Sequence, residues 1–228
     1  MNYIESIYIC MVAPLIFAII GAQAHRRRSL VFLICGMTSC LLSSYISTSV
    51  TALYGAGLMV ATVEIAPMVE ECMKLIPVLF YLMIFAPKKD FAADGILMTA
   101  IGFATFENVC YLTRNGAVNL THLVLRGFGT GAMHVVCGMV ISIGIFYLWD
   151  KLWLRVAGTV GLVFLAATMH SCYNMLISQT GAAVIIGYLI PIMITVLRLL
   201  AGRRLVLASK EDNDDEYGRK DQKDPSAS

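Results

Sequence analysis

The chain alternates long apolar runs with short polar connections over most of its length. No run shows the alternation of apolar and polar positions that is typical of strands. A helix needs about 20 mostly apolar residues to cross a membrane, so we predict an all-α fold, a polytopic transmembrane helical bundle of about seven spans. The predicted spans lie at about 3–23, 29–50, 56–85, 91–112, 122–148, 154–178 and 182–200.

Basic residues in the connections predict the orientation of these spans. Lys and Arg gather in the cytoplasmic connections of membrane proteins. Arg114 is the only basic residue in the connections near 51–57, 113–121 and 179–181. The connections that alternate with them are basic. We therefore expect the N-terminus outside and the C-terminus in the cytoplasm. The basic residues behind this orientation are Arg26, Arg27, Arg28, Lys88, Lys89, Lys151, Arg155, Arg203 and Arg204.

Composition agrees with a membrane location. Only 14% of the 228 residues are charged and 58% are hydrophobic, whereas about 25% are charged in a soluble domain. The sequence has no basic stretch with interleaved aromatic residues, the pattern that would indicate nucleic-acid binding. From residue 203 onward Asp, Glu, Lys and Ser dominate. The chain is therefore predicted to have a transmembrane domain at 1–202 and a charged, disordered cytoplasmic tail at 203–228.

Four polar motifs interrupt the apolar runs. A charged side chain near the centre of a bilayer costs roughly 2.5–3.5 kcal/mol on insertion scales. Such residues usually face a protein interior or a watery cavity and mark a functional site. The pattern therefore predicts an intramembrane active site, which makes the transmembrane domain a catalytic one. The motifs are Glu70-Glu71-x-x-Lys74, Phe103-x-x-x-Glu107-Asn108, His134-x-x-x-Gly138 and His170-x-x-x-Asn174.

Their positions place these motifs at similar depths. With a rise of about 1.5 Å per residue, Glu70 and His134 lie roughly 18 Å below the outer ends of their spans, and Glu107 and His170 roughly 10 Å below theirs. All four can meet at one level in the outer half of the membrane. Lys74 can pair with one of the two adjacent glutamates on its helix, which leaves the other carboxylate free to bind a proton, a metal or water.

Two chemistries suit carboxylates, imidazoles and an amide in one cavity. In the first, a glutamate is the general base for a water that attacks a peptide carbonyl, and His170 with Asn174 donates to the developing oxyanion. In the second, His134, His170 and a glutamate hold Zn²⁺, with water at the open position. The chain has no H-E-x-x-H helix, and the choice stays open. Glu64 and Arg126 are expected to be structural, either as a pair or with Arg126 reaching the lipid headgroups.

In order and spacing, the motifs resemble those of the PrsW family of bacterial intramembrane proteases. The resemblance rests on Ala66–Lys74, Gly102–Asn108 and the two histidine motifs. The layout is also similar to that of the CAAX prenyl endopeptidases, which use a glutamate-activated water. The resemblance implies peptide hydrolysis inside the membrane. Carried over, Glu70 would be the base, Glu107 and His134 would assist it, and His170 and Asn174 would stabilise the oxyanion. The supporting residues would be Glu71, Lys74, Phe103 and Asn108.

The resemblance also implies a partner, a location and a cofactor. The expected substrate is a single-pass membrane protein cut near the outer leaflet, as in first-site cleavage of an anti-sigma factor during envelope stress. The expected location is the bacterial cytoplasmic (inner) membrane, and the oligomeric state stays open. The family is described as metalloprotease-like, so Zn²⁺ on Glu70, His134 and His170 is a candidate cofactor. The CAAX enzymes have a histidine where this chain has Glu107, so the division of labour between Glu107 and His134 cannot be transferred.

Two other functions fit the same residues. Buried Glu and His relays also serve proton- or cation-coupled transporters, although the internal repeats common in transporters are not found here. In a membrane scaffold, by contrast, the buried ion pairs would only fix helix packing. For the scaffold, substitution of Glu70 by Gln is expected to reduce folding and yield together.

Overall fold

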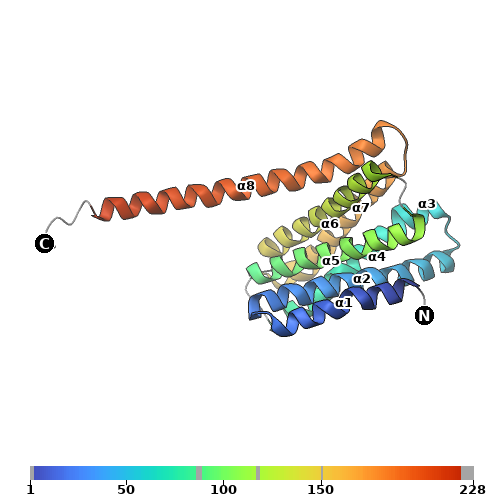
Figure 1. Ribbon diagram of the computed structural model, residues 1–228, viewed down its shortest axis with the longest axis horizontal. Helices are drawn as coiled ribbons and strands as arrows, with labels where there is room; N and C mark the ends of the chain where they lie inside the picture. Colours follow the sequence, from blue (N-terminus) through green and yellow to red (C-terminus); the bar gives the residue numbers. More distant parts are fainter. Residues whose placement is uncertain (1–2, 86–88, 117–118, 150, 222–228) are drawn as a thin grey trace. The chain divides into compact units, whose positions relative to one another are not determined.

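The computed structural model describes residues 3–85, 89–116, 119–149 and 151–221. Within these ranges every regular element is a helix and no strand is present (Figure 1). The elements are α1 (Tyr3–Gly21), α2 (Ala24–Tyr54), α3 (Leu58–Val60), the π-helix η1 (Ala61–Ile65), α4 (Ala66–Phe85), α5 (Lys89–Asn115), α6 (Leu120–Leu148), α7 (Leu152–Ile177) and α8 (Ala182–Asp221). The predicted all-α fold is confirmed.

Among the described residues, six helices are long and apolar enough to cross a membrane. They are Tyr3–Gly21, Arg26–Tyr54, Phe91–Asn115, Leu120–Ile145, Leu152–Ile177 and Ala182–Ala201. Each coincides with a predicted span. The remaining predicted span, about 56–85, contains α3, η1 and α4, and α4 carries Glu70, Glu71 and Lys74. Because these three charges and Glu64 interrupt the apolar run, its crossing stays a prediction, as does the orientation of the termini.

The chain divides into two compact units, Met1–Ile192 and Met193–Ser228. The first contains α1 to α7 and the beginning of α8, and the second contains the rest of α8. The backbone is helical as far as Asp221, and the disordered tail predicted for residues 203–228 stays a prediction. Residues 203–221 are rich in good helix formers such as Lys, Glu, Arg and Leu, and they include no proline. Residues 222–228 lie outside the described residues, and the domain boundary at 202 stays a prediction.

Helices α2 and α5 pack so closely that two positions require glycine. A side chain at Gly36 would overlap the backbone carbonyl of Thr99, and one at Gly102 would overlap the carbonyl of Leu33. Close approach of this kind is usual where small residues line a helix interface in a membrane. The α2–α5 contact therefore fixes the position of the residue that follows Gly102, the fully buried Phe103.

A π-helical turn leads into α4. Pro67 is buried in the first turn of α4; it has no N–H group, and its ring would clash with the carbonyl four residues earlier in a regular helix. The wider turn Ala61–Ile65 directly precedes it. Such turns are rare and frequently lie at functional sites. Pro77, in contrast, lies inside α4 without ending it.

Candidate active site

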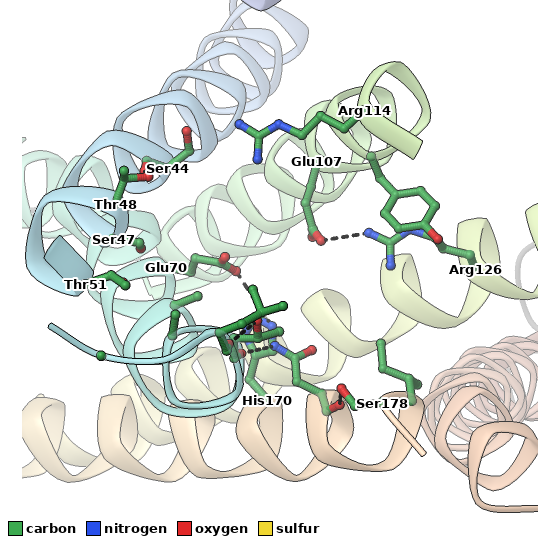
Figure 2. A pocket seen from close by; sticks show the side chains of 18 of the residues that line it. Ser44, Ser47, Thr48, Thr51, Glu70, Glu107, Arg114, Arg126, His170 and Ser178 are labelled. Carbon is green, nitrogen blue, oxygen red and sulfur yellow. Dashed lines mark hydrogen bonds and ion pairs between the residues drawn. The ribbon is translucent and has the colours of Figure 1, made fainter. Parts of the chain in front are cut away.

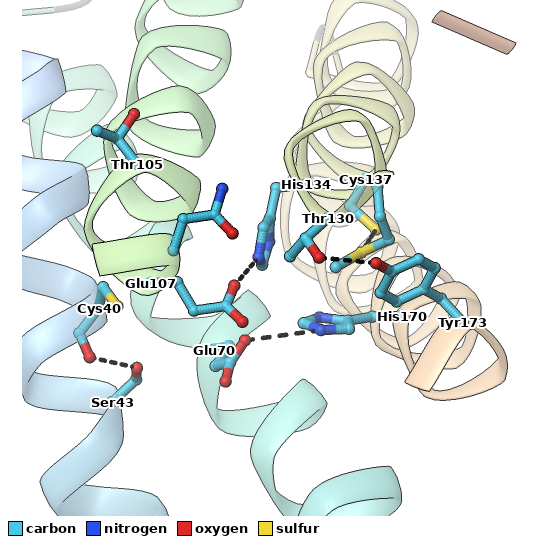
Figure 3. A network of polar contacts seen from close by, with 12 residues as sticks. Cys40, Ser43, Glu70, Thr105, Glu107, Thr130, His134, Cys137, His170 and Tyr173 are labelled. Atoms are coloured by element: carbon cyan, nitrogen blue, oxygen red, sulfur yellow. Dashed lines mark hydrogen bonds and ion pairs between the residues drawn. The ribbon is translucent and has the colours of Figure 1, made fainter. Parts of the chain in front are cut away.

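Four helices bring the predicted site residues together. Helix α4 contributes Glu70, α5 contributes Glu107, α6 contributes His134 and α7 contributes His170. Their side chains point toward one another (Figure 3). The expectation from their depths, that these four side chains converge, is confirmed.

A lysine and a glutamate join the two imidazole rings. His134 Nδ1 lies 2.9 Å from Lys74 Nζ, and Lys74 Nζ donates to Glu71 Oε1 at 2.6 Å. His170 Nδ1 lies 2.9 Å from the same Glu71 oxygen. The side chain of Lys74 is 6% exposed and that of Glu71 is 1% exposed. A buried ion pair is stable only when its attraction and additional hydrogen bonds offset the loss of hydration. Here the two histidines provide the additional hydrogen bonds.

These contacts determine which ring nitrogens carry a proton. An ammonium group has three donors and no acceptor, so charged Lys74 requires His134 Nδ1 to accept. A neutral His134 then carries its proton on Nε2, which lies 2.5 Å from Glu107 Oε2. His170 donates from Nδ1 to Glu71, so its Nε2 keeps a lone pair. The two rings are therefore prepared for different tasks, His134 as a donor and His170 as an acceptor or a metal ligand.

Glu70 presents an unpaired carboxylate oxygen. Its Oε2 lies 3.7 Å from His170 Nε2, which is too far for a hydrogen bond. Among the described residues this oxygen has no hydrogen-bond partner, although it is buried. Buried polar atoms are normally satisfied by protein, water or an ion. The position of Glu70 Oε2 is therefore suited to a water, a proton or a metal.

A large cavity lies beside Glu70 (Figure 2). Its volume of about 990 Å³ is at the upper end of the range of ligand pockets. Its walls come from the ends of helices whose connections were predicted to lie outside. His134, which is fully buried, does not line it. The lining includes Glu70, Glu107, His170 and Asn174 together with Ser44, Ser47, Thr48, Thr51, Tyr111, Arg114, His122, Arg126, Ser178 and Tyr188.

The two asparagines of the motifs form bonds between elements. Asn174 Nδ2 donates to the carbonyl of Thr62 in the π-turn at 3.0 Å. Asn108 Nδ2 faces the carbonyl of Gly127 in α6 at 3.5 Å. An asparagine amide has two N–H donors, so Asn174 keeps one for a ligand in the cavity that it lines.

Phe103 and Gly138 pack behind the histidines. The Phe103 ring lies against His134, with the ring centroids 5.0 Å apart, and Lys74 Nζ lies 5.1 Å from the Phe103 centroid. A side chain at Gly138 would lie 3.1 Å from the Cβ of Ala100. Gly138 therefore allows α5 to approach α6 closely.

Sequence reasoning placed Arg126 at the lipid headgroups or beside Glu64, and the structure differs. Arg126 is 9% exposed, and its Nη2 donates to Glu107 Oε1 at 3.1 Å. Glu64 is exposed. The guanidinium carbon lies 3.6 Å from the centroid of the Tyr111 ring. Helical spacing was the available signal, because Arg126 precedes His134 by about two turns and Tyr111 follows Glu107 by about one.

The donor atoms of the site suit a metal ion. Glu70, His134 and His170 each offer one ligand atom, and these atoms lie within 4.8 Å of one another. Ligands about 2.0–2.2 Å from a tetrahedral zinc are about 3.4 Å apart, close to the 3.7 Å between Glu70 Oε2 and His170 Nε2. A carboxylate on the other ring nitrogen, as Glu71 is on His170, is usual for metal-binding histidines. The spacing of these donor atoms fits Zn²⁺, and binding by His134 Nε2 would require this nitrogen to lose its proton and its contact with Glu107.

One comparison with known proteins gives a match for this chain. Neither the curated proteins nor the solved structures give a match to this chain. The family described as PrsW family intramembrane metalloprotease matches residues 24–200. The matched range begins with α2 and ends in α8, so it includes the cavity and every residue of the site. The chain therefore belongs to the PrsW family of intramembrane metalloproteases.

Proposed function

We propose that this protein is a membrane-embedded endopeptidase in which Glu70 activates the attacking water. The main observation is the unpaired oxygen of Glu70, which lies beside His170 in the wall of a large cavity. A general base must lie within hydrogen-bond reach of the proton that it removes. Water that enters this cavity can approach Glu70 Oε2 without breaking an existing hydrogen bond.

The other two carboxylates have different surroundings. Glu107 faces a donor with each oxygen, Arg126 with one and His134 with the other. Glu71 also has one unpaired oxygen, but its side chain is 1% exposed and does not line the large cavity. Glu70 is therefore the carboxylate that combines access with an open oxygen.

The remaining steps are assigned to the neighbours of Glu70. Glu70 takes a proton from water as the water attacks the peptide carbonyl, and returns a proton to the leaving amine. The second N–H of Asn174 is free to donate to the oxyanion. His170 would donate there only as an imidazolium, since its neutral form carries the proton on the Glu71 side. Glu71 and Lys74 hold both rings in place.

A metal-dependent form uses the same side chains. Bound by Glu70, His134 and His170, Zn²⁺ would supply Lewis acidity toward the carbonyl oxygen. Glu107 would then be the carboxylate left in the cavity wall to act as the base.

The cavity also supports a place and a substrate for the reaction. Its lining includes Thr51, Ala52, Gly55, Ala56 and Arg114, which lie in or beside connections that the positive-inside pattern places outside. We therefore propose cleavage near the outer leaflet of the bacterial inner membrane. A single-pass membrane protein such as an anti-sigma factor is the proposed substrate, on the basis of family membership.

The transporter alternative is less well supported. A carrier needs a path to the buried relay from the other side as well. On the far side of Glu71 and Lys74 the described residues leave a cavity of about 10 Å³. Apart from these two residues, its walls consist of apolar side chains and Gly138. That is room for about one water. A space of this size does not by itself provide the path from the other side that a carrier needs.

The test is reconstitution of the full chain with single-pass peptides and mass spectrometry of the products. Wild type is expected to release two fragments. Glu70→Gln is expected to lower kcat by at least about 100-fold without loss of yield, and Glu64→Gln, an exposed glutamate of the preceding turn, to leave it unchanged. Zinc-reversible loss of cleavage with a chelator would assign the metal-dependent form. Intact peptides with wild type, or wild-type rates with Glu70→Gln, would contradict the proposal.

A further inference from the structure

Arg126 is buried where a basic residue could easily have reached water. It lies about two turns into α6, close enough to the helix end for its long side chain to extend to headgroups. Instead it is 9% exposed and points inward beside Glu107 (Figure 2). The guanidinium carbon lies 3.6 Å from the centre of the Tyr111 ring, a distance typical of cation–π contacts. The contact with Tyr111 therefore helps to explain why Arg126 is buried.

The partner of Arg126 is a site residue with a second contact. Arg126 Nη2 donates to Glu107 Oε1 at 3.1 Å, and the other oxygen of Glu107 meets His134 Nε2 at 2.5 Å. Tyr111 lies one turn beyond Glu107 on α5. Tyr111 therefore holds the guanidinium on the same face of α5 that presents Glu107. Arg126 fixes one oxygen of this carboxylate while the other contacts the imidazole.

The charge of Arg126 is permanent, which makes it suitable for this task. Arginine stays protonated in proteins, so the field that it exerts on Glu107 does not vary during a reaction. A carboxylate between a fixed guanidinium and an imidazole keeps one orientation. Without Arg126, one oxygen of Glu107 would lose its donor, and the side chain would be free to turn toward the cavity that it lines.

We infer that Arg126 is a positioning residue that holds Glu107 against His134 and thereby keeps Glu107 from competing with Glu70 for the attacking water. The catalytic part of this inference rests on the proposed function. An ion pair that only joins α5 and α6 would contribute to stability, but its loss would not change the geometry of His134.

The first experiment needs no cleavage. Proton–nitrogen NMR of the histidine side chains is recorded on the full chain in lipid nanodiscs. A strongly deshielded Nε2–H proton is expected, assigned to His134 by its loss in His134→Gln. In Arg126→Met it is expected to move upfield or vanish. In Arg155→Met it should stay, because Arg155, 5.7 Å from the ring centre of Trp149, is exposed and outside the site. Absence of the signal in wild type, or an unchanged signal in Arg126→Met, overturns the inference.

The second experiment measures peptide cleavage by the same variants. Arg126→Met is expected to lower kcat about 10–100-fold, as for other residues that orient an active-site group, with KM within about twofold. Arg126→Lys should recover part of the loss, because it restores the charge but not the planar fork. The double variant Glu107→Gln/Arg126→Met should be no slower than Glu107→Gln alone. Additive losses would overturn the inference. Failure of wild type to cleave would contradict the proposed function, and the spectra would still decide the role of Arg126.

Discussion

At the scale of single residues, the site depends on which atoms already have partners. Three glutamates lie near two histidines, yet their environments differ. Glu71 is enclosed with Lys74, Glu107 is held by Arg126 and His134, and Glu70 faces the cavity with an open oxygen. Chemically identical side chains thus acquire separate tasks from their neighbours.

Lys74 is expected to be essential for folding as well as for activity. Lys74→Met would leave Glu71 as a buried carboxylate without its cation, and breaking a buried pair typically costs about 3–5 kcal/mol. The free energy of unfolding in detergent should fall by about that amount. In the double variant Lys74→Met/Glu71→Met most of the loss should be recovered, because no isolated charge remains.

Lys151→Met is the matched control, since Lys151 is exposed at the start of α7. Its unfolding free energy should change by less than about 0.5 kcal/mol. An equally small change in Lys74→Met would show that the Lys74–Glu71 pair does not stabilise the fold.

Sequence patterns predicted which residues meet at the site better than they predicted the residues that contact them. Helical spacing and depth were sufficient for Glu70, Glu107, His134 and His170, because charged groups in apolar spans must face the interior. The same reasoning failed for Arg126, since a single cation near a span end satisfies the headgroup interpretation equally well. The contact from Asn174 to Thr62 was also inaccessible, because it depends on a π-turn that no spacing rule predicts.

At the scale of elements, the α2–α5 contact controls the placement of the motif on α5. Gly36 and Gly102 lie where each helix touches the backbone of the other. This packing role could not be predicted for these glycines over others, because a glycine in an apolar helix does not reveal its neighbour.

Gly102→Ala is expected to destabilise the protein by about 1–3 kcal/mol, the usual range for overpacking. The methyl group would overlap the Leu33 carbonyl, and the two helices would have to separate. Peptide cleavage should fall as well, since Phe103 and Glu107 move with α5. Thermal unfolding and cleavage rates of the variant check both effects.

Gly161→Ala provides the comparison within α7, because nothing lies within 4 Å of a side chain there. Alanine favours helix over glycine by about 1 kcal/mol, so this variant should be as stable as wild type or more so. If Gly102→Ala behaved like Gly161→Ala, the close approach of α2 and α5 would not limit packing.

At the scale of the whole molecule, the six apolar helices of the described part and membership of a membrane protease family indicate a multi-pass membrane protein, and orientation decides on which side the cavity opens. The positive-inside pattern places the α7–α8 connection outside and the α1–α2 connection in the cytoplasm. Gln179 and Gln23 are exposed glutamines in these two connections.

In a cysteine-free background, Gln179→Cys in intact cells should react with a membrane-impermeant thiol reagent. Gln23→Cys should react only after the membrane is permeabilised. The opposite pattern would place the mouth of the cavity in the cytoplasm and would contradict cleavage at the outer leaflet.

The recessed position of Glu70 has a consequence for what the protein can digest. In an intact α-helix each peptide carbonyl is bonded within the helix and surrounded by side chains, so it cannot meet a carboxylate oxygen that is buried in a cavity wall. A target must therefore unwind locally before it is cut. Glycine or proline near the scissile bond makes a helix easier to unwind, and leucine or alanine makes it harder. How easily the helix unwinds there should therefore select the cleavage point more strongly than the identity of any one side chain.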